Sequence, residues 1–224
     1  MASLGLLASG IAHEINNPLN FIKGGFYALK NYFEDNLPEH LNTVLSILNA
    51  INTGADRAAN IVDSLNHYSR QNDGTTSNCD IHSIIDNCLV MLQSQTKNRI
   101  KIFKTYTNES FYLLGNEGKL HQAMLNVLSN AVQAIEGNGK IEISTLVNKN
   151  HVFFVLKDSG KGINSTDLSK IFDPFFTTKE VGRGTGLGLS ITQNIVLEHN
   201  GYIEIESEPG HGTKVVMQFP IKKN

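Results

Sequence analysis

One histidine in this chain has surroundings that favour reaction. His13 lies in the segment Gly-Ile-Ala-His-Glu-Ile-Asn-Asn-Pro-Leu, residues 10–19, with Glu14 directly after it. A neutral imidazole is a good nucleophile near neutral pH, and a neighbouring carboxylate can orient it and help to accept its proton. Pro18 falls inside a helical pattern, where proline costs about 3 kcal/mol and predicts a kink. The alternative is an ordinary solvated histidine.

Two asparagines could bind a divalent cation. Asn126 and Asn130 are four residues apart within a predicted helix at 117–136, so their amides lie on one face. Amide oxygens are suitable ligands for Mg²⁺, which keeps several waters and shares the phosphates of a nucleotide. Exposed asparagines on a helix are usually only solvated surface, and that interpretation stays open.

Two glycine-rich segments could hold a nucleotide. Asp158-Ser-Gly160-Lys-Gly162 follows an apolar strand, and a carboxylate there could accept a hydrogen bond from an exocyclic amine such as that of adenine. The run Arg-Gly-Thr-Gly-Leu-Gly-Leu at 183–189 opens a helical pattern, where glycines and free N–H groups favour phosphate. Each segment alone could equally be a plain turn, and the second fits neither a P-loop nor a dinucleotide fingerprint.

Two long amphipathic helices must carry His13. Apolar residues recur at steps of three and four along residues 4–33 and again along 41–65, with Pro38 between the two stretches. His13 lies off the first stripe, so its ring should be exposed. The two helices predict an antiparallel hairpin, and pairing two copies into a four-helix bundle would bury the stripes.

The remainder of the chain predicts a mixed domain. Residues 71–78 contain no apolar side chain and predict a linker. Helices are expected near 80–96, 117–136 and 185–199, which together with the strands predict an α+β sandwich. The long segment 159–184 shows neither the spacing of apolar residues typical of a helix nor that of a strand, and it predicts a functional loop or lid. The expected strands are Ile100–Tyr106, Lys140–Val147, Val152–Lys157, Tyr202–Ser207 and Lys214–Phe219.

Composition narrows the function classes. The net charge is −2 without a long basic run, so nucleic-acid binding has no electrostatic support. No apolar stretch approaches the about 20 residues that span a bilayer, and no signal peptide is visible. Cys79 and Cys88 have neither metal-ligand nor redox spacing, and the other seven histidines show no zinc spacing. We therefore expect a cytoplasmic protein.

Four segments carry the candidate residues: the one around His13, the asparagine pair, the one that begins at Asp158 and the glycine run at 183–189. In their order and separation they resemble the H, N, G1 and G2 boxes of bacterial two-component histidine kinases. The block Ile-Phe-Asp-Pro-Phe-Phe-Thr-Thr-Lys at 171–179 resembles the family's F box. The H box is especially similar to that of nitrogen-regulation and C4-dicarboxylate sensor kinases. The resemblance implies a dimerisation and phosphotransfer hairpin at 1–71, a linker at 72–77 and an ATP-binding domain of the gyrase type at 78–224.

The resemblance also implies a role for each matching residue. His13 becomes the phosphoacceptor, Glu14 its activating carboxylate and Asn17 a residue that positions water in receiver dephosphorylation. Asn130 becomes the Mg²⁺ ligand and Asp158 the contact to the adenine amine. The expected nucleotide-binding set is completed by Asn126, Gly160, Gly162, Phe172, Lys179, Gly184, Thr185, Gly186, Leu187 and Gly188.

The resemblance implies a homodimeric autokinase. It would use ATP with Mg²⁺ to phosphorylate His13 and pass the phosphoryl group to the aspartate of a response-regulator receiver domain. A phosphatase activity toward the phosphorylated receiver is a further expectation. The alternative is a non-catalytic scaffold that only holds nucleotide. Because the chain starts just before the H box, we expect a fragment of a longer, perhaps membrane-bound sensor that itself contacts neither nucleic acid nor membrane.

Overall fold

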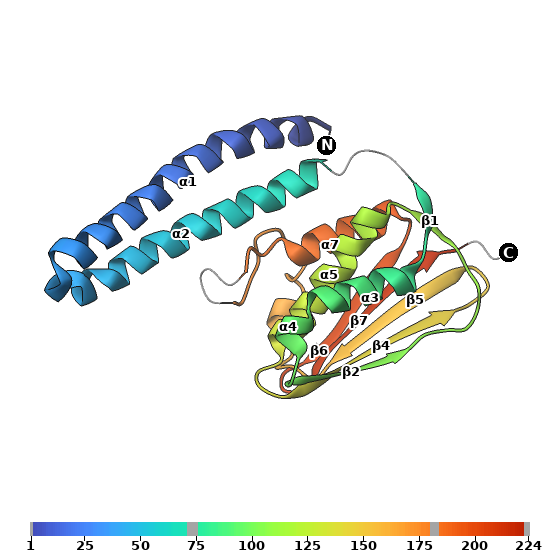
Figure 1. The fold of residues 1–224 in the computed structure, drawn as a ribbon. Helices are drawn as coiled ribbons and strands as arrows, with labels where there is room; N and C mark the ends of the chain where they lie inside the picture. The colour runs from blue at the N-terminus through green and yellow to red at the C-terminus, as the bar shows by residue number, and fades with distance from the viewer. Residues whose placement is uncertain (1, 71–75, 180–183, 222–224) are drawn as a thin grey trace. The chain divides into compact units, whose positions relative to one another are not determined.

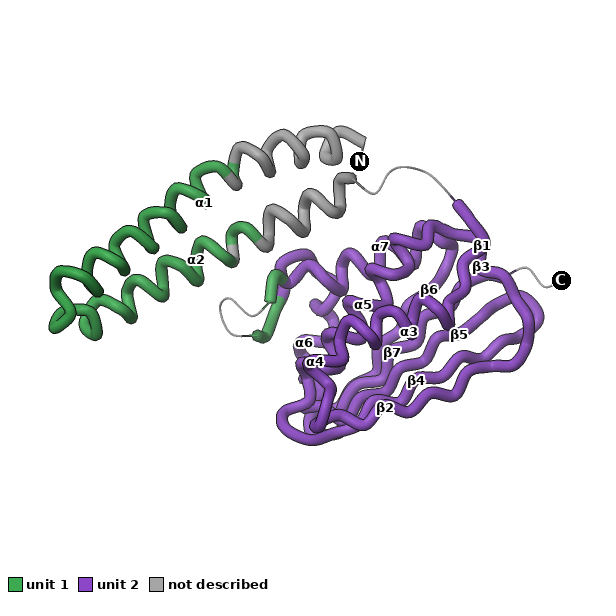
Figure 2. Tube along the Cα trace, viewed as in Figure 1, with its two compact units in different colours: residues 1–73, 177–185 green, residues 74–176, 186–224 purple. Residues whose placement is uncertain are grey.

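The chain divides into two compact units (Figure 2). The computed structural model describes residues 2–70, 76–179 and 184–221, with the side chains of 2–14, 16, 57 and 60–70 outside the description. The first unit comprises residues 1–73 with 177–185, and the second comprises 74–176 with 186–224. The predicted order, a helical hairpin followed by an α/β sheet domain, is confirmed. Within the described residues, no helix has the length and apolar character needed to span a membrane.

The hairpin consists of α1 (Ala2–Asn36) and α2 (Pro38–Arg70), with only Leu37 between them. Pro38 occupies the first position of its helix, where a missing N–H costs nothing. Pro18 lies inside the continuous helix α1. Among the described side chains, the buried apolar residues of the hairpin are Leu19, Phe26, Leu48 and Ala55.

The second unit is built on a five-stranded sheet in the order β2-β4-β5-β7-β6. β2 pairs in parallel with β4, and the other neighbours are antiparallel. All five predicted strands form, within two residues of the expected limits. Their bounds are Ile100–Thr105 for β2, Gly139–Val147 for β4, His151–Asp158 for β5, Tyr202–Glu208 for β6 and Gly212–Pro220 for β7.

Helices cover one face of this sheet (Figure 1). They are α3 (Ile81–Met91), α5 (Glu117–Ala134) and α7 (Gly188–Glu198), with the short α4 (Gln93–Thr96) and α6 (Ser165–Leu168). The alternating residues of β4 and β5 that point to the helices are buried, which gives a single core between the two layers. A second buried cluster joins α5 to α7 through Ala123, Leu187, Ile191 and Ile195.

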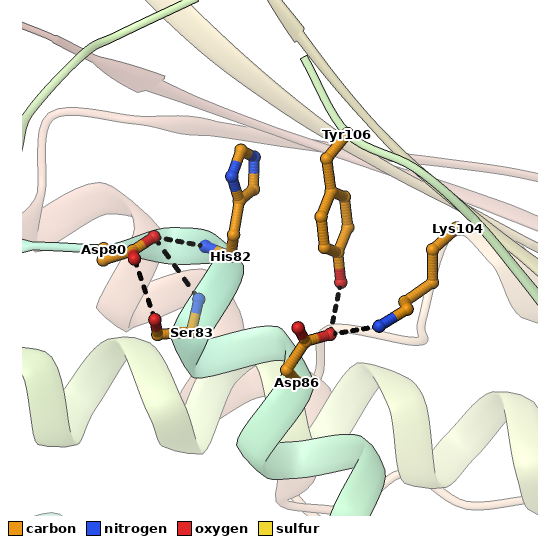
Figure 3. A network of polar contacts seen from close by, with 6 residues as sticks. All are labelled: Asp80, His82, Ser83, Asp86, Lys104 and Tyr106. Carbon is orange, nitrogen blue, oxygen red and sulfur yellow. Dashed lines mark hydrogen bonds and ion pairs between the residues drawn. The ribbon is translucent and has the colours of Figure 1, made fainter. Parts of the chain in front are cut away.

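The residues that follow the linker form an unforeseen polar network (Figure 3). A two-stranded sheet of β1 (Ser77–Cys79) and β3 (Leu113–Gly115) leads into Asp80, which caps α3. The His82 ring stacks on Tyr106 with centroids 4.4 Å apart, and its Nε2 lies 2.8 Å from Thr145 Oγ1. The Asp86 carboxylate accepts from both Tyr106 and Lys104. Neither short strand was predicted, because three residues are too few to show an alternating pattern.

Candidate functional site

Asp158 ends β5 and is buried, with 9% of its surface exposed. Its Oδ1 accepts hydrogen bonds from the backbone N–H of Gly160 at 2.7 Å and of Thr213 at 3.3 Å. Burial raises the pKa of the carboxyl, while these two donors act in the opposite direction. No donor to Oδ2 is found among the described residues, so this oxygen can accept from a bound ligand.

The loop after Asp158 packs on the C-terminal end of α5. The Lys161 N–H donates to Ala134 O at 3.0 Å, and a side chain at Gly160 would place its Cβ 2.7 Å from that of Ala134. Position 160 therefore requires glycine because the two backbones approach too closely for any other residue. Gly162 follows in the same loop, so the structure brings Asp158, Gly160 and Gly162 together as predicted.

Asn126 of α5 lies beside the start of α7. The Asn126 amide donates to Gly188 O at 3.1 Å and to Thr192 Oγ1 at 3.4 Å, and both asparagines are half-buried. Because these bonds use the Nδ2 group, the carbonyl oxygen of Asn126 keeps its acceptor capacity. The contact from Asn126 to the first turn of α7 was not predicted.

Helix α7 begins at Gly188 without a side-chain cap. Its N-cap Leu187 is buried and makes no side-chain capping bond. No capping side chain therefore neutralises the positive end of the helix dipole, which lies at the first-turn N–H groups. Gly186 has φ of +70° and lies against the backbone of Phe175, which only glycine allows. Phe172 packs partly buried against the main core. A helix start of this kind favours anions.

Other predicted site residues belong to the first compact unit or have side chains that are not described. Lys179, Gly184 and Thr185 belong to the first compact unit, where a Cβ on Gly184 would lie 3.1 Å from Lys179 Cδ. Asn17 is exposed on α1. The side chains of His13 and Glu14 lie outside the described part of the chain, so the predicted exposure of His13 remains a prediction.

Sequence reasoning missed Thr213, which contributes to the Asp158 site through its backbone N–H. A backbone donor has no side-chain signature, and the only available signal was the Gly-His-Gly segment at 210–212, which leads into β7.

The two asparagine amides of α5 fit Mg²⁺ only if a nucleotide supplies further oxygen ligands. Among the described residues, no group of three or more His, Cys, Asp or Glu side chains could hold a metal ion. The amide oxygens of α5 are hard donors that suit an ion held mainly by phosphates and water.

Two families match the chain. Residues 3–74 match the His Kinase A (phospho-acceptor) domain. Residues 115–223 match the family described as histidine kinase-, DNA gyrase B- and HSP90-like ATPases. Both matches fall in the order expected from the sequence.

Curated relatives align along nearly the whole chain. The signal transduction histidine-protein kinase AtoS of Escherichia coli is 34% identical over 99% of this chain and 35% of the relative. Sporulation kinase A of Bacillus subtilis is 34% identical over 97% of this chain and 35% of the relative. The chain thus spans about a third of the length of these relatives.

Solved structures share the fold. Histidine kinase ThkA in complex with response regulator protein TrrA matches with a TM-score of 0.65 and 28% identity, over 97% of this chain and 61% of that chain. Full-length ShkA in complex with AMPPNP matches with a TM-score of 0.71 and 22% identity, over 97% of this chain and 46% of that chain, and supports the fold alone. With both domain families matched in sequence order, this chain belongs to the two-component histidine kinases and represents their catalytic core.

Proposed function

We propose that this chain binds ATP and transfers its γ-phosphoryl group to His13. The observation that carries the proposal is the arrangement in the second unit. The buried Asp158 and its glycine loop pack on one end of α5, and Asn126 of the same helix bonds the uncapped start of α7. One helix thus links a carboxylate suited to an amine with a helix start suited to phosphate.

In this proposal, Asp158 Oδ2 accepts a hydrogen bond from the adenine amine, and Gly160 and Gly162 let the base lie against the backbone. Phe172 anchors the lid, while Lys179, Gly184 and Thr185 contribute from it. Gly186, Leu187 and Gly188 present backbone N–H groups to the phosphates. The motif match and the start of α7, which has no side-chain cap, support these roles.

Asn130 would hold Mg²⁺ through its amide oxygen, with Asn126 beside it, and the ion would supply neutralisation of the phosphate charge. Asn126 stands where the related hydrolytic ATPases have a glutamate. Because an amide cannot take a proton from water, this position favours transfer of the phosphoryl group over hydrolysis.

On the hairpin, the His13 imidazole would form a bond to the γ-phosphorus while the bond from that phosphorus to the β–γ bridging oxygen breaks. ADP would leave with the electron pair of the broken bond, and Glu14 would accept the imidazole proton. Asn17 lies four residues after His13 on α1, a spacing that corresponds to about one helical turn. Its exposed amide can orient water with a donor and an acceptor, which supports a role in dephosphorylating a receiver aspartate.

The proposed partners are a second copy of this chain and a response-regulator receiver domain. Phe21 is 81% exposed and Ile47 61% exposed on the hairpin, which supports the dimeric four-helix bundle. The complex of ThkA with TrrA supports a receiver as phosphoryl acceptor. We further propose the division into a hairpin at 1–71, a linker at 72–77 and an ATP-binding domain at 78–224, acting in the cytoplasm.

Incubation with γ-labelled ATP and Mg²⁺ tests the proposal. Phosphohistidine is labile to acid and stable to alkali, so the chain should acquire label that is lost in acid and retained in base. Label that survives acid would indicate a different acceptor. Tight ATP binding without any label would favour the scaffold alternative.

A further inference from the structure

The side chain of Arg99 holds the C-terminal end of α5 from outside the helix. Its Nη2 donates to Val132 O at 2.9 Å, and its Nη1 donates to Ile135 O at 2.8 Å and to Gly137 O at 3.3 Å. Its Nε donates to Gln95 O at 2.6 Å. One planar guanidinium therefore bonds four carbonyl oxygens.

These bonds meet a specific need of the helix. The last carbonyls of an α-helix have no partner within it, and α5 ends at Ala134 without glycine after its C-cap Ile135. A cation also complements the negative end of the helix dipole. The Arg99 carbonyl in turn accepts from Gly139 N at 2.9 Å, so the same residue fixes the start of β4.

The clamped segment lies directly against the nucleotide loop. Ala134 falls between Val132 and Ile135, and its carbonyl accepts from Lys161 N. A Cβ added at Gly160 would lie only 2.7 Å from the Cβ of Ala134. Gly160 N then donates to Asp158 Oδ1. A displacement at the end of α5 is thus transmitted through two backbone contacts to the carboxylate proposed to bind adenine.

We propose that Arg99 is a positioning residue for the nucleotide site. By clamping the C-terminal carbonyls of α5, it sets the position of Ala134 and, through Gly160, the orientation of Asp158 toward the base. This inference rests on the proposed ATP binding. Arg99 acts on base recognition, whereas Asn126, in the middle of α5, and the start of α7 that it bonds are left in place.

Arg99→Lys and Arg99→Ala test this role in the full chain. Lysine can satisfy one or two of the carbonyls but lacks the planar fork, so its effect should lie between those of wild type and alanine. For Arg99→Ala we expect a rise of about tenfold in the Kd for ATP and the KM of autophosphorylation. The rate at saturating ATP should be kept, and discrimination between ATP and GTP should narrow.

Two controls separate positioning from general loss of stability. Thr145→Val removes the acceptor for Thr107 N at the far end of β4, where it pairs with Phe154. This variant should melt at a lower temperature with unchanged KM and unchanged preference for ATP over GTP. Millimolar guanidinium should partly restore ATP affinity to Arg99→Ala, whereas millimolar tetramethylammonium should not.

The outcomes are distinct. A lower melting temperature for both Arg99 variants with wild-type KM and wild-type nucleotide preference would overturn the inference and leave the proposed function intact. If Arg99→Ala does not fold, the same comparison is made on Arg99→Lys alone. Failure of the wild-type chain to bind ATP would overturn the proposed function and this inference together.

Discussion

The hairpin and the sheet domain bury their apolar residues to very different extents. In the sheet domain, Leu120, Met124 and Leu128 of α5 are fully enclosed, with 0% of their surface exposed. On the hairpin, Phe21 is 81% exposed and Ile47 is 61% exposed. The sheet domain completes its core within one chain, whereas the hairpin keeps large apolar side chains available for a partner.

The two regions also place their polar groups differently. The sheet domain encloses His199, whose Nδ1–H donates to Ile195 O at 2.7 Å while Nε2 accepts from Asn116 N at 3.0 Å. On the hairpin, Asn17 is exposed. The sheet domain thus pairs a buried polar side chain within its own core, whereas the hairpin presents a polar amide at its surface.

The largest effect is expected from a change confined to the hairpin. His13→Gln removes the proposed nucleophile, so label incorporation from γ-labelled ATP should be abolished. Because the sheet domain is unchanged, ATP affinity by calorimetry should equal that of the wild type. Acid-labile label that persists in this variant would disprove the assignment of His13, and a parallel loss of ATP binding would contradict the independence of the two regions.

Asp158→Asn changes the sheet domain with a smaller effect. Asparagine Oδ1 can still accept from Gly160 and Thr213, but its Nδ2 group would face the adenine amine donor to donor. Loss of that acceptor costs about 1–3 kcal/mol, which corresponds to a Kd for ATP about tenfold to a hundredfold higher. Calorimetry with ATP and GTP measures this change, and equal affinities for wild type and variant would exclude the proposed contact.

Asp158→Asn is also expected to change the stability of the sheet domain. Burial raises the pKa of Asp158 in the folded state. The folded state then binds a proton more tightly, so stability falls as pH rises from the unfolded pKa through the raised folded pKa. Asparagine carries no charge, so Asp158→Asn should melt at or above the wild-type temperature at neutral pH. A clear drop would mean that the ionised carboxylate stabilises the fold.

Much of the fold was predictable from the sequence. The long periodic stretches at 4–33 and 41–65 and the five alternating strands carry strong signals, and all of them form. The short strands β1 and β3 were not predictable. Their hydrogen bonds join Ser77–Cys79 to Leu113–Gly115, across more than thirty residues, and neither segment shows a pattern by itself.

The residues of the candidate site have a sequence signal where a side chain or a glycine is involved. The loop of Asp158 and Gly160 contacts the C-terminal end of α5, and Asn126 in the middle of that helix bonds Gly188. Their roles in nucleotide binding remain predictions. The contribution of Arg99 was not predictable. Its partners are backbone carbonyls, which any residue at those positions would provide, so the interaction leaves no trace in the sequence of the helix that it clamps.

The smallest effect is expected in the network beside the linker. Burial lowers the pKa of His82 in the folded state, with Asp80 and Asp86 acting in the opposite direction. The unfolded chain then binds more protons than the folded chain as pH falls below about 6.5, so the folded state loses stability as the pH is lowered.

His82→Phe keeps an aromatic ring against Tyr106 and removes the titration. Between pH 7 and pH 5, its melting temperature should fall less than that of the wild type, by about 1–2 °C. The carboxyls of Asp80 and Asp86 have lowered pKa values and titrate below this pH range. They therefore do not mask the difference in melting temperature between wild type and His82→Phe. His40→Phe, an exposed site on the hairpin, is the matched control. If wild type and His82→Phe lose the same stability between these pH values, the half-buried imidazole of His82 does not distinguish the sheet domain from the hairpin.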